Sequence, residues 1–243
     1  MPNELDDFLT STRRYFAQQQ DLFGNIVYHD DMKKKANVAT EFPKEANASN
    51  ESWIHATTVD QLHEEIRDCL KCPLGSTRTK FVFGTGNPKS KVMFIGEAPG
   101  ADEDVQGEPF VGRAGQLLNK IIEAVDMKRE DVYICNIIKC RPPNNRAPLP
   151  IESETCTPYL MKQIELVQPA FIICLGRTAA QWLLQTNDGL GTMRGKVHDY
   201  NGRKLIVTYH PAALLRNPDW KRPTWEDMKM FKKLYDEMTP AQS

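Results

Sequence analysis

Long apolar runs are absent from this 243-residue sequence, and so is a strong excess of charge of one sign. No apolar stretch approaches the ~20 residues that a membrane-spanning helix needs. The N-terminus is acidic over residues 1–7 and lacks the basic and then apolar layout of a secretory signal. We therefore expect a cytoplasmic protein with no membrane partner, whose six cysteines are thiols or metal ligands rather than disulfides.

Two signatures of nucleotide binding are also missing. Neither G-x-x-x-x-G-K-[ST] nor G-x-G-x-x-G occurs, so the glycine-containing segments 96–100 and 107–112 are not predicted to be phosphate loops.

The net charge of the chain is only −1, from 31 basic and 32 acidic residues, but the charges are unevenly distributed. Residues 1–65 hold 6 basic and 12 acidic residues, so the remainder of the chain holds 25 basic and 20 acidic ones. A modestly basic body is compatible with DNA binding without requiring it.

The spacing of apolar residues divides the chain into three parts. Helical spacing over residues 3–20 predicts an amphipathic helix, and we assign residues 1–30 to an N-terminal helical extension. Residues 31–54 are polar and are predicted to be a flexible linker, and residues 55–238 form the main domain. The extension is a candidate either for docking another protein or for packing back onto the domain.

Strands and helices alternate within the main domain. Apolar runs at 92–95, 132–135, 171–175 and 205–209 predict strands, and Asn201-Gly202 predicts a hairpin that leads into the last of them. This order predicts a three-layer α/β/α domain with a central, mostly parallel, four-stranded sheet. Glu97, Asn136 and His210 each follow a predicted strand. Because ligands bind beyond the carboxyl ends of parallel strands, we expect these three side chains to meet there.

Four cysteines have the spacing of a metal site. Cys69 and Cys72 form a C-x-x-C pair, whereas Cys140 and Cys156 are separated by a proline-rich segment. A zinc ribbon normally has two close pairs, and the second pair is missing. The pattern favours a [4Fe–4S] cluster, although zinc and no metal at all both remain compatible with the spacing alone. The other two cysteines lie in apolar strands and are predicted to be core thiols.

Two loops carry residues suited to binding a flat polar ring. Glu97 follows a strand and Phe110 precedes a helix, so a carboxylate, an aromatic face and backbone N–H groups could surround such a ring. Phe110 alone is equally compatible with a place in the core. His210 begins a segment, residues 210–216, in which apolar residues beside an arginine fit a loop that wedges into a duplex. A histidine there is equally compatible with a structural role.

These segments, taken together and in order, closely resemble the family 4 uracil-DNA glycosylases, which carry a [4Fe–4S] cluster. The resemblance covers about residues 58–236 and is carried by GEAPG at 96–100, GEPFVG at 107–112, NIIKCRPP at 136–143, Asn145-Arg146, GTMRG at 191–195 and TYHPAALLR at 208–216. It implies a monomeric repair enzyme that flips uracil out of single- or double-stranded DNA and hydrolyses the N-glycosidic bond, leaving an abasic site for base excision repair.

The resemblance also implies roles for individual residues. The residues that line the uracil pocket would be Gly96, Glu97, Glu103, Phe110, Asn136 and His210. The ligands of the cluster would be Cys69, Cys72, Cys140 and Cys156. Phe110 would stack on the uracil ring, Asn136 would read its amide edge, and Glu103 would help to exclude thymine.

Catalysis would fall to Glu97, Asn136 and His210. Glu97 would bind the attacking water and His210 would stabilise charge on a ring oxygen, while Leu214 would fill the hole left by the flipped base.

Basic residues in or beside the same loops are predicted to contact phosphates. They are Lys139, Arg141, Arg146, Arg194 and Arg216. No lysine stands at a clear nucleophile position, so we expect a monofunctional enzyme that does not cut the strand.

Three other functions fit less well. An iron–sulfur DNA-binding protein without turnover would not need the pocket residues, all of which are present. A protein that captures uracil-DNA covalently would have a histidine in a basic insertion after the second motif, and residues 139–146 have neither. A reductase would need a second cofactor site, and no motif for one is visible.

Overall fold

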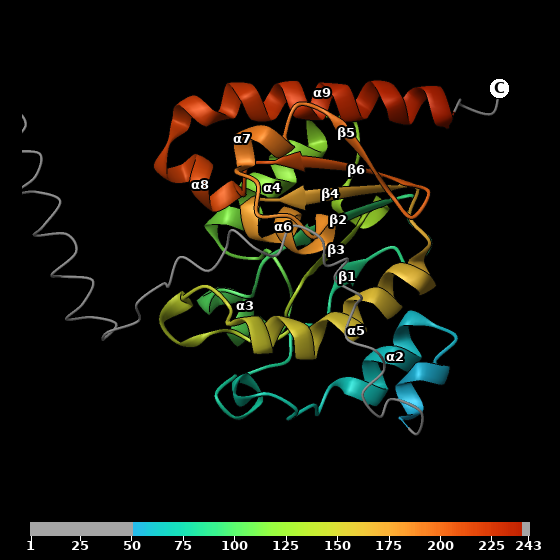
Figure 1. The fold of residues 1–243 in the computed structure, drawn as a ribbon, viewed down its shortest axis with the longest axis vertical. Helices are drawn as coiled ribbons and strands as arrows, with labels where there is room; N and C mark the ends of the chain where they lie inside the picture. The colour runs from blue at the N-terminus through green and yellow to red at the C-terminus, as the bar shows by residue number, and fades with distance from the viewer. Residues whose placement is uncertain (1–50, 240–243) are drawn as a thin grey trace, which may run out of the picture. The chain divides into compact units, whose positions relative to one another are not determined.

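The computed structural model describes residues 51–239, and its centre is a six-stranded sheet (Figure 1). The strands lie side by side in the order β1 (Thr85–Gly86), β3 (Tyr133–Asn136), β2 (Val92–Gly96), β4 (Phe171–Leu175), β6 (Arg203–Thr208) and β5 (Val197–Tyr200). The four inner strands are parallel, and the two edge strands pair antiparallel with β3 and β6. The carboxyl ends of the inner strands therefore share one edge of the sheet.

The predicted count of four strands is wrong, although all four predicted strands are present and parallel. The two strands beyond that count are short or polar: β1 has two residues, and β5 is largely exposed. Apolar runs mark only strands that are buried on both faces, as β2 and β4 are. An edge strand with a solvated face gives no such run, and the predicted hairpin at Asn201-Gly202 is the turn that joins β5 to β6.

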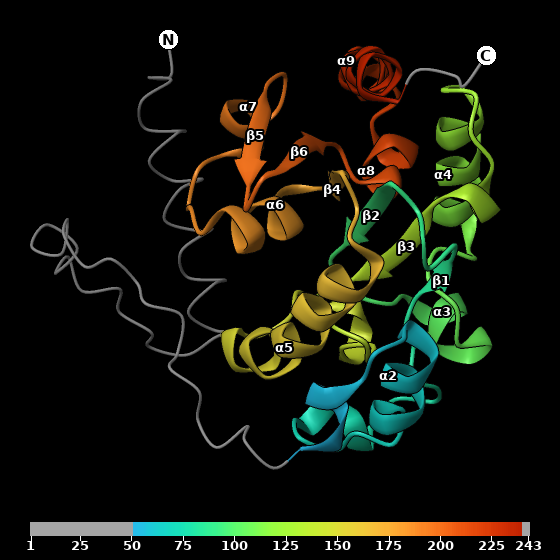
Figure 2. The same ribbon diagram turned by 90° about the vertical axis from the view of Figure 1, so that its right-hand side faces the viewer.

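Helices cover both faces of the sheet, so the predicted three layers are confirmed (Figure 2). One face packs against α4 (Arg113–Glu123) and α9 (Lys221–Met238), and the other against α2 (Val59–Ile66), α5 (Pro150–Val167) and α6 (Arg177–Leu184). Alternate strand residues serve the two faces: Phe94 packs under α4 and α9, whereas Met93 and Ile95 pack on the α2–α5–α6 side.

Short elements connect these layers. They are α3 (Ala101–Gln106), α7 (Leu190–Met193), α8 (Pro211–Arg216) and the 3-10 turns η3 (Ser52–His55), η4 (Pro73–Ser76), η5 (Arg129–Asp131), η6 (Pro143–Asn145) and η7 (Pro218–Trp220). Helix α2 begins after Thr58, whose hydroxyl caps it by accepting from the Gln61 N–H at 3.1 Å. No helix within residues 51–239 is long and apolar enough to cross a membrane.

The predicted N-terminal extension and residues 31–50 of the predicted linker lie outside the described residues. The last residues of that linker, 51–54, run into η3 and connect directly to the domain.

Candidate active site

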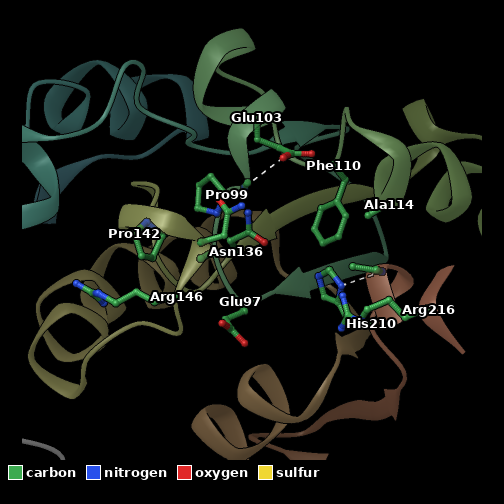
Figure 3. A pocket seen from close by; sticks show the side chains of 14 residues that line it. Glu97, Pro99, Glu103, Phe110, Ala114, Asn136, Pro142, Arg146, His210 and Arg216 are labelled. Carbon is green, nitrogen blue, oxygen red and sulfur yellow. Dashed lines mark hydrogen bonds between the residues drawn. The ribbon is translucent and has the colours of Figure 1, made fainter. Parts of the chain in front are cut away.

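A cavity of about 420 Å³ opens beyond the carboxyl ends of β2, β3 and β6 (Figure 3). Its lining includes five predicted pocket residues and two predicted DNA contacts, namely Glu97, Glu103, Phe110, Asn136, His210, Arg146 and Arg216. Gly96 is paired with Asn136 in the parallel register of β2 and β3, and Glu97 follows it directly. The expectation that Glu97, Asn136 and His210 meet at one edge of the sheet is therefore confirmed.

Asn136 presents an unpartnered acceptor inside this site. The residue is 1% exposed, and its side-chain Oδ1 has no hydrogen-bond partner among residues 51–239. A buried acceptor left unpaired costs about 1–3 kcal/mol, so the free protein bears this cost until a ligand offers a donor. The side chain is thus suited to reading an N–H group on a ligand.

Gly96 is needed for the walls of the cavity to approach one another. A Cβ atom at this position would overlap Asn136 Oδ1 and would lie 2.6 Å from Phe110 Cζ. The amide and the aromatic ring can share the site only because β2 ends without a side chain.

Phe110 packs in the core and also lines the cavity, so a place in the core does not exclude a role in stacking on a ligand. It is buried against α4 and the sheet, and it also lines the cavity, with its ring centroid 5.5 Å from that of His210. Its backbone has φ +54°, a left-handed conformation that costs a residue other than glycine on the order of 1 kcal/mol. The surrounding structure must hold this conformation.

The Glu103 carboxylate forms part of that support. One of its oxygens accepts from the N–H groups of Val111 and Gly112, each at 3.0 Å, and the other accepts from Gly100 N–H at 3.1 Å. Glu103 therefore joins the loop after β2 to the loop that carries Phe110. The sequence suggests only a contact with the ligand. The bond to Gly100 follows a helix-capping pattern, since Glu103 is three residues after that N-cap, whereas the bonds to the Phe110 loop have no local sequence signal.

His210 is held as a neutral ring. Burial, and to a lesser degree the positive charge of Arg216, lowers its pKa from 6.5 to about 4. Its Nδ1 accepts from the Ala212 N–H at 3.1 Å, which caps the first turn of α8. Because Nδ1 is an acceptor, the proton of the neutral imidazole is on Nε2, which makes Nε2 a hydrogen-bond donor.

Three predicted DNA contacts lie away from the surface. Lys139 is 0% exposed, and Leu214 is 1% exposed where its neighbour Leu215 is 40% exposed. The Arg194 side chain is 16% exposed and is engaged by the buried Asp227 carboxylate, to which it donates at 3.0 and 2.7 Å. These three side chains pack or pair inside the protein, and their contacts with DNA stay predictions.

The remaining predicted contacts lie at or near the rim. Arg216 is exposed at the cavity, and Arg146 lines it while donating two hydrogen bonds to the buried Glu152 carboxylate, at 2.8 and 2.6 Å. Arg141 donates to Asn145 Oδ1 at 2.8 Å. Hydrogen bonds therefore hold the guanidinium groups of Arg146 and Arg141, whereas that of Arg216 has no such bond to any residue within 51–239.

The four spaced cysteines lie on the α2–α5 side of the sheet, and none of them is in a disulfide. Burial raises the pKa of the Cys140 thiol, and the hydrogen bond from Arg78 lowers it. Arg78 Nη1 lies 3.3 Å from Cys140 Sγ, and Tyr159 Oη lies 3.3 Å from Cys69 Sγ. Within residues 51–239, no three His, Cys, Asp or Glu side chains converge as ligands of one metal ion.

The sequence matches the model of the Uracil DNA glycosylase superfamily over residues 83–234. It is 44% identical over 192 residues to a type-4 uracil-DNA glycosylase of Archaeoglobus fulgidus, covering 76% of this chain and 96% of that protein. It is 46% identical over 183 residues to one of Saccharolobus solfataricus, covering 72% and 85%. A type-5 uracil-DNA glycosylase of Pyrobaculum aerophilum is more distant, with 29% identity over 146 residues, covering 53% and 64%.

The state of His210 can be tested by NMR titration of the ¹⁵N-labelled protein, with the ring assigned by its absence from His210→Gln. We expect Nδ1 without a proton, Nε2 with one, and a midpoint near pH 4. The unfolded chain takes up this proton near pH 6.5, so the contribution of His210 to stability should fall as pH drops from 6.5 towards 4. A midpoint near 6.5 would contradict the buried neutral ring.

Proposed function

Because the chain belongs to the type 4 branch of the uracil-DNA glycosylase superfamily, we propose that it is a monofunctional glycosylase that extrudes uracil from single- and double-stranded DNA. It hydrolyses the N-glycosidic bond within the cavity beyond β2, β3 and β6. The observation that carries the proposal is the unpartnered Oδ1 of Asn136, buried beside the Phe110 ring. Uracil offers an N–H donor on a flat ring, and this combination suits it.

Charge develops in two places during the reaction. The departing uracil gains negative charge, and the sugar gains positive character, so donors are needed at the ring and a carboxylate near the sugar. His210 Nε2–H donates to a uracil oxygen and needs no change of protonation above pH 5, since its pKa is about 4. Glu97 lines the same cavity and orients water towards the sugar carbon.

The lining of the cavity supports hydrolysis without strand cleavage. Strand-cleaving glycosylases use an amine nucleophile, and no lysine is among the residues that line this cavity. Lys139, the nearest candidate in the motif, points into the protein and is fully buried.

DNA binding falls to the rim around α8. Arg216 contacts the phosphate backbone, with Arg146 and Arg141 on the neighbouring loop. Leu215 is the exposed apolar residue of α8, and we assign it the wedge role in preference to the buried Leu214.

We also propose that Cys69, Cys72, Cys140 and Cys156 hold a [4Fe–4S] cluster. The donor set fits: Cys140 and Cys156 belong to one core cluster and Cys69 and Cys72 pack against it, with an arginine and a tyrosine hydroxyl available to hydrogen-bond their sulfurs. A four-iron cluster is larger than a single ion, so its ligand sulfurs lie farther apart than those of a zinc site. Bound there, the cluster would cross-link three segments: the one between α2 and η4, the loop after β3, and helix α5.

The role of Asn136 can be tested by single-turnover cleavage of a uracil oligonucleotide, with abasic sites revealed by alkali. Asn136→Ala should lose about 10²–10³ in rate, the usual cost of one transition-state hydrogen bond in such a site. Its affinity for the same oligonucleotide with thymine in place of uracil should change little. Wild-type cleavage by Asn136→Ala would exclude this cavity as the uracil site.

The wedge can be tested by comparing adjacent leucines on matched single- and double-stranded substrates. Leu215→Ala should slow cleavage of the duplex far more than cleavage of the single strand, because a wedge matters only where a stacked base must be replaced. Leu214→Ala should instead lower the free energy of unfolding by about 2–5 kcal/mol, as for other buried leucines. A duplex-selective defect in Leu214→Ala with a normal Leu215→Ala would reverse the assignment.

The cofactor can be tested by metal analysis of protein purified without air. We expect brown protein with about four irons per chain, as a four-thiolate [4Fe–4S] site requires. Cys69→Ala and Cys140→Ala should lose iron, whereas Cys174→Ser, which changes a fully buried strand thiol, should retain it. Stoichiometric zinc without iron would refute the cluster.

A further inference from the structure

A single carboxylate oxygen, buried outside the cavity, joins three elements of the domain. Asp227 of α9 is 1% exposed, and its Oδ2 accepts from Arg194 Nε at 3.0 Å and from Arg194 Nη2 at 2.7 Å. The same oxygen accepts from the hydroxyl of Thr208, the last residue of β6, at 2.8 Å. Arg194 follows α7 directly and also donates to the Pro223 carbonyl of α9. This oxygen therefore links α7, α9 and the end of β6.

The chemistry proposed above makes no use of this ion pair. Arg194, Asp227 and Thr208 do not line the cavity, and the carboxylate is buried among the elements that it joins. A buried ion pair is a weak source of stability, because the cost of desolvation offsets most of the attraction between the charges. Two hydrogen bonds from one guanidinium group do, however, fix the direction of both side chains. The pair is thus better suited to hold a geometry than to stabilise the fold.

The segment that the pair holds leads directly to His210. Tyr209 stands between Thr208 and His210 in the chain. The Arg194 guanidinium lies over the Tyr209 ring, 4.8 Å from its centroid. The same ring stacks on Trp220, with the centroids 4.8 Å apart and the planes at 19°. Arg194 therefore contacts the residue before His210 as well as the carboxylate that holds Thr208.

His210 has close neighbours that leave it little room to move. The Thr208 carbonyl accepts from the Gly176 N–H at 2.9 Å, which ties the end of β6 to the end of β4. A Cβ atom at Gly176, whose φ is +96°, would lie 3.1 Å from His210 Cβ. The Phe110 ring is 5.5 Å from the imidazole, centroid to centroid. A small displacement of the end of β6 would therefore change where the imidazole Nε2 points.

We propose that the Arg194–Asp227 ion pair positions His210 for catalysis. It fixes Thr208 and Tyr209, so that the imidazole Nε2 points into the uracil pocket. The inference rests on the proposed function, because it concerns how a donor of that site is held. Such placement matters, since a misplacement of about 1 Å can cost on the order of 10²-fold in rate. Arg194 is thereby given a role inside the protein in place of a contact with a DNA phosphate.

The experiment is a double-mutant cycle on the full-length protein, purified without air. It is measured by single-turnover cleavage of a single-stranded uracil oligonucleotide at saturating protein. Asp227→Asn keeps the size of the side chain and removes its charge, and it should lower the rate about tenfold. In a His210→Ala background the same change should have almost no effect, because residues that act as one unit are not additive. General damage to the fold would slow both backgrounds alike.

Glu226→Gln is the matched control, because it removes the same charge one residue away, from an exposed side chain that is paired with Lys229 at 2.7 Å. It should leave the rate unchanged. Affinity for the oligonucleotide with thymine in place of uracil should be the same for wild type and Asp227→Asn, since Asp227 does not line the cavity. The ¹⁵N signals of the His210 ring and of the Ala212 N–H that it accepts from should shift in Asp227→Asn and not in Glu226→Gln.

Thr208→Val and Thr208→Ser provide the test should Asp227→Asn fail to fold. Valine has the shape of threonine without the hydroxyl, so Thr208→Val should slow cleavage and shift the same signals. Thr208→Ser keeps the donor and should recover both.

An equal loss of rate in both backgrounds would overturn the positioning role and leave the proposed glycosylase intact. Wild-type rates in a folded Asp227→Asn or Thr208→Val, or a loss of affinity without a loss of rate, would do the same. Wild-type protein that does not cleave uracil would overturn the proposed function and the positioning role together.

Discussion

The close approach of three chain segments at Gly96 is the constraint on which the rest of the site depends. Parallel pairing brings the end of β2 beside the end of β3, so that Gly96 faces Asn136. The Phe110 ring then reaches the same point from the loop before α4, and the absence of a side chain leaves room for both. Everything that holds Phe110 in its left-handed conformation, including the Glu103 carboxylate, acts to maintain this contact.

The two faces of the sheet support this contact in different ways. On one face, α4 and α9 form an apolar layer that includes Phe110 itself. On the other face lie the cysteine-bearing segments and the Lys139–Gln163 pair, which connect to the pocket through hydrogen bonds rather than through packing. Asn136 connects the cavity to the second of these faces, because its side chain lines the cavity and its backbone carbonyl accepts a hydrogen bond from Lys139.

The sequence predicted the features that follow from a local pattern of residues. It did not predict the direction in which a side chain points or the contacts between residues far apart in the chain. Apolar runs identified the four inner strands, and because Glu97, Asn136 and His210 follow those strands, their meeting could be inferred. The edge strands β1 and β5 escaped the count because a solvated strand has no continuous apolar run. A place in a site loop does not say which way a side chain points, so the sequence did not show that Lys139, Arg194 and Leu214 pack or pair inside the protein. Arg78 and Gln163 gave no signal, since their partners lie far away in the chain.

The unpartnered oxygen of Asn136 has a consequence for the bases that such a cavity would refuse. A ring with a lone pair at the matching position would set two acceptors face to face in a space that excludes water, and neither could turn to solvent for relief. Cytosine has such a lone pair at N3, where uracil has a hydrogen. Normal cytosine, nearly the same size as uracil, would therefore be rejected by electrostatic repulsion rather than by shape.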